Sequence, residues 1–213
     1  MLVFTRANFT LFAVPKTGST AYHLALRAKA QIVLSQDTAL KHMTLRKYDR
    51  HFAPYLRDAH GLSPERVAVM RDPLDQVRSW YRYRMRPKVK GGPSDLTGMS
   101  FDDFVADVIA PNPPAHARIG SQFTFLSAPD GALRVHHLFA YERPDLFDAF
   151  LADRLGETVR PRRKNVSPPV EASLSAEMEE AFIAARPEEW ALYKAMMVAG
   201  GHLVTEVADA TAA

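Results

Sequence analysis

Cysteine is absent from this chain of 213 residues. The absence excludes disulfide bonds, zinc–thiolate sites and a cysteine nucleophile, and it fits a reducing compartment. No apolar run reaches the ~18 residues that a membrane-spanning helix needs, and the first residues lack the basic segment and apolar core of a signal peptide. We therefore expect a cytoplasmic protein with no membrane partner.

The rest of the composition is that of an ordinary globular protein, with 47% hydrophobic and 24% charged residues. The length suits a single domain covering residues 1–213, in which 205–213 are expected to form a frayed tail. The formal net charge is +3, and two groups of basic residues lie at 71–90 and 160–164. These groups favour anionic partners, although solvated helix and loop faces would explain many of the arginines equally well.

Short apolar runs alternate with helix-spaced segments along the chain. We expect strands at residues 9–14, 31–35, 66–70 and 133–141, with helices starting near Ser19, Pro73 and Ser100. Further helices are expected at 44–58, from 141 to Leu155, at 175–185 and at 188–198. This alternation predicts βαβ units, and hence an α/β fold with a central, mostly parallel β-sheet flanked by helices.

The stretch FTLFAVPKTGSTAYHLAL, residues 9–26, predicts a strand that feeds a helix through a tight polar turn. Such a turn directs several backbone N–H groups and the positive end of the helix dipole at one point, which suits a phosphate or another oxyanion. Gly18 permits close approach to the backbone, Ser19 and Thr20 add hydroxyl groups, and Lys16 adds a positive charge. The stretch therefore predicts an anion site.

A second polar turn follows a later strand in VAVMRDPLDQVRSWYRY, residues 67–83. Arg71 lies at the carboxyl end of that strand, and Ser79 lies two turns into the next helix. Because the carboxyl ends of parallel strands share one edge of a sheet, Arg71 should face the same crevice as the first turn. The two turns together predict a ligand with two separated phosphate-like groups.

These two segments resemble the cofactor motifs of the PAPS-dependent sulfotransferases. PKTGST (15–20) resembles their 5′-phosphosulfate loop, and R-D-P-x5-S-x-Y (71–81) resembles their 3′-phosphate motif. Other pieces follow in the order typical of Golgi-type carbohydrate sulfotransferases and their bacterial relatives: Lys41-His42-Met43-Thr44, His116 and Gln122, Tyr141-Glu142-Arg143, and Lys164-Asn165-Val166-Ser167. The resemblance implies a P-loop-like fold. It also implies transfer of a sulfuryl group from 3′-phosphoadenosine 5′-phosphosulfate (PAPS) to a hydroxyl group, in preference to an amine, of a carbohydrate or small metabolite, leaving adenosine 3′,5′-bisphosphate.

The resemblance also implies roles for single residues. Lys16 would stabilise the charge on the departing nucleotide, and His42 is the candidate general base, because the unperturbed pKa of histidine, ~6.5, suits that task. The 5′-phosphate would be bound by Lys16, Thr17, Gly18, Ser19 and Thr20, and the 3′-phosphate by Arg71 and Ser79. No metal is expected, because no carboxylate pair of the kind that holds Mg²⁺ stands out beside the loop.

Two other functions stay open on sequence grounds. A nucleotide-dependent kinase would also need a phosphate loop, but in G-x-x-x-x-G-K-[ST] the lysine follows the glycine, whereas Lys16 precedes Gly18. A non-catalytic anion or nucleic-acid binding protein would use the arginines of 71–90, although the aromatic residues among them have core-like helical spacing. We expect no nucleic-acid partner, and the sequence predicts neither the acceptor nor the oligomeric state.

Overall fold

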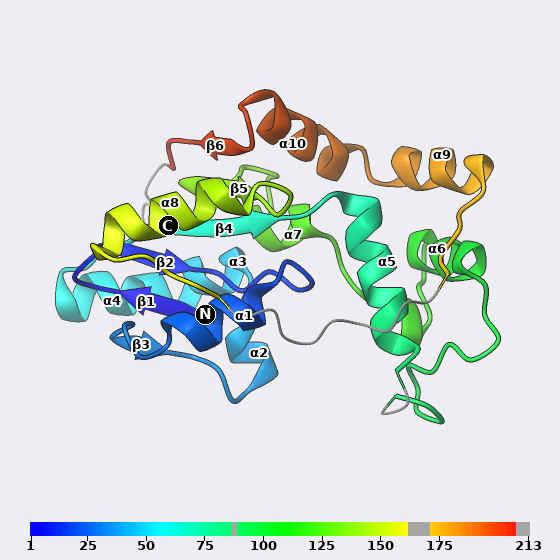
Figure 1. The fold of residues 1–213 in the computed structure, drawn as a ribbon, viewed down its shortest axis with the longest axis horizontal. Helices are drawn as coiled ribbons and strands as arrows, with labels where there is room; N and C mark the ends of the chain where they lie inside the picture. The colour runs from blue at the N-terminus through cyan, green and yellow to red at the C-terminus, as the bar shows by residue number, and fades with distance from the viewer. Residues whose placement is uncertain (87–88, 162–170, 208–213) are drawn as a thin grey trace.

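A computed structural model describes residues 1–86, 89–161 and 171–207 of the chain. These residues form an open sheet whose six strands lie in the order β3-β1-β2-β4-β5-β6, with helices on both faces (Figure 1). The strands are β1 (Leu2–Phe4), β2 (Phe9–Leu11), β3 (Ile32–Val33), β4 (Glu65–Met70), β5 (His137–Ala140) and β6 (His202–Val204). The α/β class with flanking helices is thus confirmed.

The sheet is mixed, which corrects the prediction of a mostly parallel one. Only the central pairs β2–β4 and β4–β5 are parallel, whereas β1–β2, β1–β3 and β5–β6 are antiparallel. The reason is partly one of chain length: four residues connect β1 to β2, and so short a connection permits only an antiparallel pair. The parallel centre still brings the carboxyl ends of β2, β4 and β5 to one edge.

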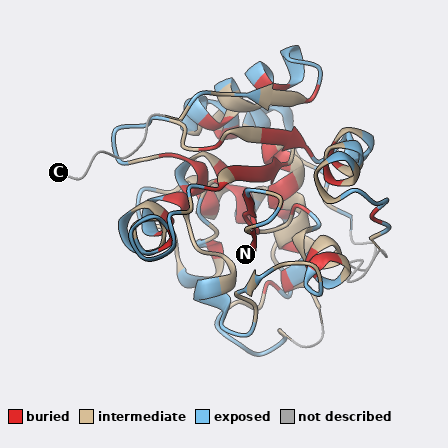
Figure 2. Ribbon diagram, turned by 90° about the vertical axis from the view of Figure 1, so that its left-hand side faces the viewer, coloured by how far each residue is buried: buried red, intermediate tan, exposed pale blue. Residues whose placement is uncertain are grey.

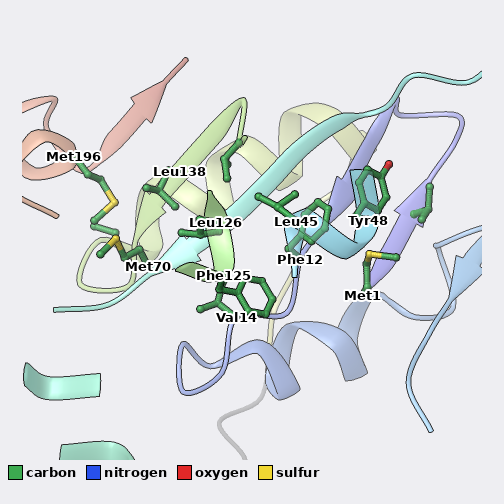
Figure 3. Close-up of a cluster of buried hydrophobic side chains, with 14 of the residues drawn as sticks. Met1, Phe12, Val14, Leu45, Tyr48, Met70, Phe125, Leu126, Leu138 and Met196 are labelled. Carbon is green, nitrogen blue, oxygen red and sulfur yellow. The ribbon is translucent and has the colours of Figure 1, made fainter. Parts of the chain in front are cut away.

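Alternate side chains of the strands enter different cores. In β4, Ala68 and Met70 belong to a cluster on one face of the sheet, and Val67 and Val69 belong to a cluster on the other. The first cluster also takes residues from α3 (Leu45–Lys47), the π-helical turn η1 (Tyr48–Phe52), α4 (Ala53–His60), α7 (Gln122–Leu126) and α10 (Pro187–Val198) (Figure 3). This face is therefore fully covered along β4.

The opposite face of the sheet is covered by α1 (Ser19–Leu26) and α8 (Pro144–Leu155). Leu26 of α1 and Phe147 of α8 are fully buried in its cluster. Figure 2 shows the consequence, with the central strands buried and the outer surfaces of the helices exposed.

A third apolar cluster lies beyond the carboxyl end of β4. It joins α5 (Pro73–Arg84), α6 (Phe101–Ile109), the 3-10 turn η2 (Ala115–Ala117) and α9 (Ala176–Ala185), and α5, α6 and α9 stand together at one end of the molecule in Figure 1. Ser100 caps α6 as predicted, in a capping box with Asp103. Helix α5 therefore stands between this cluster and the edge of the sheet where the phosphate site is predicted.

Several predicted elements differ in their bounds. The strand expected at 31–35 shrinks to β3, the strand expected at 133–141 shrinks to β5, and the helix expected at 44–58 is interrupted by the π-helical turn and ends at His60. The strands β1 and β6 and the helices α2 (Thr38–Lys41) and α7 were not predicted. Residues 208–213 of the expected tail lie outside the described residues.

Candidate functional site

The turn between β2 and α1 is held by two left-handed residues and one buried hydroxyl group. Lys16 has φ +68° and Gly18 has φ +71°, and the hydroxyl group of Thr17 donates to the carbonyl of Val14 at 2.9 Å. A Cβ at Gly18 would lie 3.3 Å from the ring of Tyr141, closer than most side-chain contacts. Glycine is thus required at position 18 both by the backbone conformation and by the close approach.

The backbone of this turn presents unused hydrogen-bond donors. Among the described residues, the N–H groups of the five residues 16–20 have no acceptor, and the first bonded one is that of Ala21, which donates to the carbonyl of Gly18 at 2.9 Å. Gly18 is the N-cap of α1 and has no side chain to satisfy them. These donors and the helix dipole favour an anion at this point, as the sequence predicts.

The side chain of Lys16 crosses from the turn to helix α5. Its ammonium nitrogen lies 4.4 Å from the centre of the Trp80 ring and 3.4 Å from that of Tyr83. Burial, reinforced by Arg86, Arg84 and Arg71, lowers the pKa of Lys16 to about 7. In the described part of the chain no carboxylate pairs with this lysine. Because an unpaired buried charge is costly, the surroundings of Lys16 favour an incoming anion.

Arg71 lies next to the same turn. Its Nη1 donates to the carbonyl of Lys16 at 3.2 Å, while Nε and Nη2 bind the carboxylate of Asp75 at 2.7 and 2.5 Å. Ser79 is half-buried one turn after Asp75 on α5, beside Trp80. The structure therefore brings Arg71 and the helix that carries Ser79 to the loop, with the guanidinium of Arg71 already sharing its charge with Asp75.

The backbone of Arg71 is held by the buried side chain of Gln122. The amide oxygen of Gln122 accepts from the N–H of Arg71 at 2.9 Å, and the amide nitrogen donates to the carbonyl of Arg71 at 2.8 Å. The N–H of Gln122 in turn donates to Glu189 at 2.8 Å, and Glu189 pairs with Arg186 at 3.2 Å. Burial raises the pKa of Glu189, whereas Arg186 and the N–H of Gln122 oppose that rise.

The carboxyl end of β5 supports the loop as well. The ring of Tyr141 lies 4.5 Å from the guanidinium carbon of Arg71 and covers Gly18. Glu142, expected to be a structural hydrogen-bonder, accepts from the N–H of Asp72 at 2.9 Å. Both residues thus position the two turns rather than facing away from them.

His42 follows α2 and packs under the end of β2. Its Nδ1 lies 2.6 Å from the carbonyl oxygen of Ala13, and because a carbonyl only accepts, this nitrogen carries the proton of the neutral ring. The other ring nitrogen, Nε2, is then a proton acceptor. Burial lowers the pKa of His42, the bond to Ala13 opposes this shift, and Lys41 and Lys16 add to it. His42 is therefore neutral near pH 7, in the state that a general base needs.

Four other histidines have structural partners or are buried. His116 binds Asp107 at 2.6 Å, and His136 accepts from the N–H of Arg66 at 2.9 Å. His23 is buried within α1, and burial lowers its pKa to about 4. His137 lies 3.6 Å from Glu65. Compared with these four histidines, His42 alone lies beside the loop with a ring nitrogen, Nε2, that can accept a proton.

Sequence reasoning missed part of the site. Trp80 was interpreted as a helix-spaced core residue, yet it lies against Lys16, as does Tyr83, which was expected to reach the cofactor or acceptor. The nitrogen of Lys41 reaches the hydroxyl group of Thr20 at 3.3 Å. The lysine at 41 could have been noticed, since it stands beside His42 in the same motif. The segment Lys164–Ser167 of the resemblance lies outside the described residues.

Within residues 1–86, 89–161 and 171–207 no group of three or more His, Asp or Glu side chains is arranged to hold a metal ion. In the same ranges, none of the helices has the length and apolarity needed to cross a bilayer. Comparison with known proteins finds no matching family model, no matching curated protein and no matching solved structure.

Proposed function

We propose that the chain is a sulfotransferase with a P-loop-like phosphate site, using PAPS as the sulfuryl donor and a hydroxyl group of a carbohydrate or small metabolite as the acceptor. The observation that carries the proposal is the β2–α1 turn, where five successive N–H groups have no acceptor in the described chain, and from which Lys16 extends to α5 with no carboxylate partner among the described residues. The absence of cysteine fits the cytoplasm as its location.

The residues present fit such a nucleotide. The N–H groups of residues 16–20, with the hydroxyl groups of Ser19 and Thr20, would hold the 5′-phosphate. Arg71 and Ser79 would hold the 3′-phosphate. A guanidinium has five N–H donors, and Asp75 occupies those on Nε and Nη2, so Arg71 can hold Asp75 and contact a phosphate together.

Bound PAPS would supply an activated sulfuryl group whose transfer, like phosphoryl transfer, depends mainly on positioning and on neutralisation of charge. With such a nucleotide bound, Lys16 would supply positive charge to offset the negative charge that grows on the departing nucleotide. His42 accepts the proton of the acceptor hydroxyl group at Nε2, because Nδ1 is occupied by the carbonyl of Ala13. The lowered pKa of His42 keeps this nitrogen unprotonated at neutral pH.

The experiment that tests the proposal compares three nucleotides by calorimetry: adenosine 3′,5′-bisphosphate, adenosine 5′-monophosphate, and ATP with Mg²⁺. We expect the bisphosphate to bind at least tenfold more tightly than the monophosphate, and Arg71→Ala to remove most of this preference. Lys16→Ala should abolish transfer from PAPS while the folded state persists. Binding of ATP with Mg²⁺ but not of the bisphosphate would refute the proposal in favour of a kinase.

Steeply salt-dependent binding of nucleic acid that survives His42→Gln would indicate the non-catalytic function instead. A sulfotransferase should lose transfer in His42→Gln and keep its affinity for the bisphosphate, because His42 acts on the acceptor. This variant therefore separates the two functions.

A further inference from the structure

Arg84 is a buried cation that the proposed nucleotide site does not use. It lies on the last turn of α5, and only 7% of its surface is exposed. Its Nε and Nη1 atoms are buried and have no hydrogen-bond partner among the described residues. Buried arginines are nearly always paired or hydrogen-bonded, because burying an uncompensated charge is costly. The folded chain thus bears a cost at Arg84 that no hydrogen bond to these two atoms within its described part offsets.

The positive charges near Arg84 add to this cost, whereas the ring of Trp80 offsets part of it. Its guanidinium carbon lies 5.5 Å from the centre of the Trp80 ring, the same ring that Lys16 approaches to 4.4 Å. Arg84 and Lys16 are close enough that each charge disfavours the other, and Arg84 contributes to the lowered pKa of Lys16. Arg86 also lies close to this group, because its guanidinium carbon is 5.1 Å from the centre of the Tyr83 ring. Positive charge therefore accumulates around the Trp80 and Tyr83 rings.

The position of this cluster relative to the loop indicates what it binds. In the proposed reaction the sulfuryl group lies at Lys16, between the nucleotide on the loop side and the acceptor on the other side. Arg84 and Lys16 both approach the ring of Trp80, so Arg84 lies on α5 near the ammonium of Lys16. A guanidinium N–H group that lacks an acceptor favours an anionic oxygen, such as that of a carboxylate or a sulfate ester.

We infer that Arg84 binds an anionic group of the acceptor, a carboxylate or a sulfate ester, so that the acceptor of the sulfuryl group is itself an anion. That the bound anion is an acceptor rests on the proposed function, whereas the anion site at Arg84 can be tested without it. A neutral sugar would leave Arg84 uncompensated, whereas an acidic sugar would both pair with it and orient the hydroxyl group toward Lys16.

The first measurement separates a binding role from a purely structural one. If Arg84 were retained for packing, Arg84→Met would lower the unfolding midpoint. If it is retained for an external anion, the same change removes an unpaired buried charge and should raise the midpoint by several degrees. Arg50→Met, which removes an exposed arginine on η1, is the charge-matched control and should leave the midpoint nearly unchanged.

The second measurement uses matched sugars with adenosine 3′,5′-bisphosphate at saturation. D-glucuronate and D-glucose 6-sulfate carry an anionic group, D-glucose does not, and binding is followed by calorimetry. We expect at least one of the two anions to bind tenfold or more tightly than glucose. Arg84→Met should remove this preference and change the affinity for the bisphosphate less than twofold, while Arg50→Met should keep the preference.

Equal affinity for the three sugars, or a preference that survives Arg84→Met, would overturn the inference even if the bisphosphate binds. Failure of the bisphosphate to bind would instead count against the proposed function. In that case the same titrations on the nucleotide-free protein still decide whether Arg84 forms an anion site, because the preference and its loss in Arg84→Met do not depend on the nucleotide.

Discussion

Replacing Lys16 by methionine should stabilise the folded protein while abolishing its proposed activity. The side chain lies between the rings of Trp80 and Tyr83, and no carboxylate within the described residues neutralises it. Methionine has a similar length, carries no charge and makes favourable contacts with aromatic rings. The substitution therefore keeps the packing and removes only the buried charge.

The magnitude follows from the pKa of Lys16, which falls from 10.5 to about 7 on folding. At about 1.4 kcal/mol for each pKa unit, this fall corresponds to about 4–5 kcal/mol of destabilisation below pH 7. The two contacts with aromatic rings, at about 0.5–2 kcal/mol each, favour the charged lysine and offset part of it. We expect Lys16→Met to raise the free energy of unfolding by up to about 4 kcal/mol at pH 7.

The sign of the pH dependence provides a second check. A lysine whose folded pKa lies below its unfolded pKa binds its proton more weakly in the folded state, so the unfolded chain carries the extra proton between about pH 7 and pH 10.5. The contribution of Lys16 to stability therefore rises with pH across this window. The advantage of Lys16→Met should accordingly shrink by about 2 kcal/mol between pH 7 and pH 9.

Urea denaturation of both proteins at pH 7, 8 and 9 measures this difference, in a buffer free of phosphate and sulfate. Taking the difference between the two proteins cancels the titration of groups that they share. A variant less stable than the parent at pH 7, or a stability difference that does not change with pH, would show that the ammonium of Lys16 is not buried against α5.

Two other substitutions test the support of the loop. Gln122→Ala leaves the N–H and carbonyl of Arg71 without partners, so urea denaturation should show a loss of about 2–4 kcal/mol, and a loss below 1 kcal/mol would contradict the double hydrogen bond. Gly18→Ala should cost about 1–2 kcal/mol for its positive φ and should weaken binding of adenosine 3′,5′-bisphosphate several-fold. Gly61→Ala is the matched control, since its φ is also positive but its Cβ would meet open space; an equal effect on nucleotide binding would count against the loop as the site.

The elements nearest the site could be predicted well because strong local signals bound them. The strand expected at 66–70 is β4, Glu65–Met70, which ends just before Asp72 and Pro73, and the predicted helix start at Ser19 agrees with α1. Gly18 and Pro73 are residues whose backbone preferences act locally and need no tertiary contact. The order of β2, the turn and α1 was therefore available from sequence.

The antiparallel strands were not predictable in the same way. The strands β1 and β6 are three residues long, too short for a pattern of period two to stand out, and β6 depends on pairing with β5 for its conformation. Their effect on the sheet was therefore missed, and with it the mixed character of the fold.

The contacts that orient the site depend on residues far apart in the chain. Gln122 reaches Arg71 across 51 residues, and His42 reaches Ala13 across 29. Nothing near Lys16 in the sequence indicates that its side chain extends toward α5 rather than into the turn. The candidate residues could thus be named from local motifs, whereas their orientation was a property of the tertiary structure.

The chain of hydrogen bonds from Arg186 through Glu189 and Gln122 to Arg71 has a consequence for biosynthesis. The β2–α1 turn and the turn at Arg71 emerge early from the ribosome, but the carboxylate that orders Gln122 belongs to α10 and is made 67 residues after Gln122. A nascent chain therefore has both turns before it can hold them together. The proposed nucleotide site would be complete only when α10 docks, which would tie ligand affinity to completion of nearly the whole polypeptide.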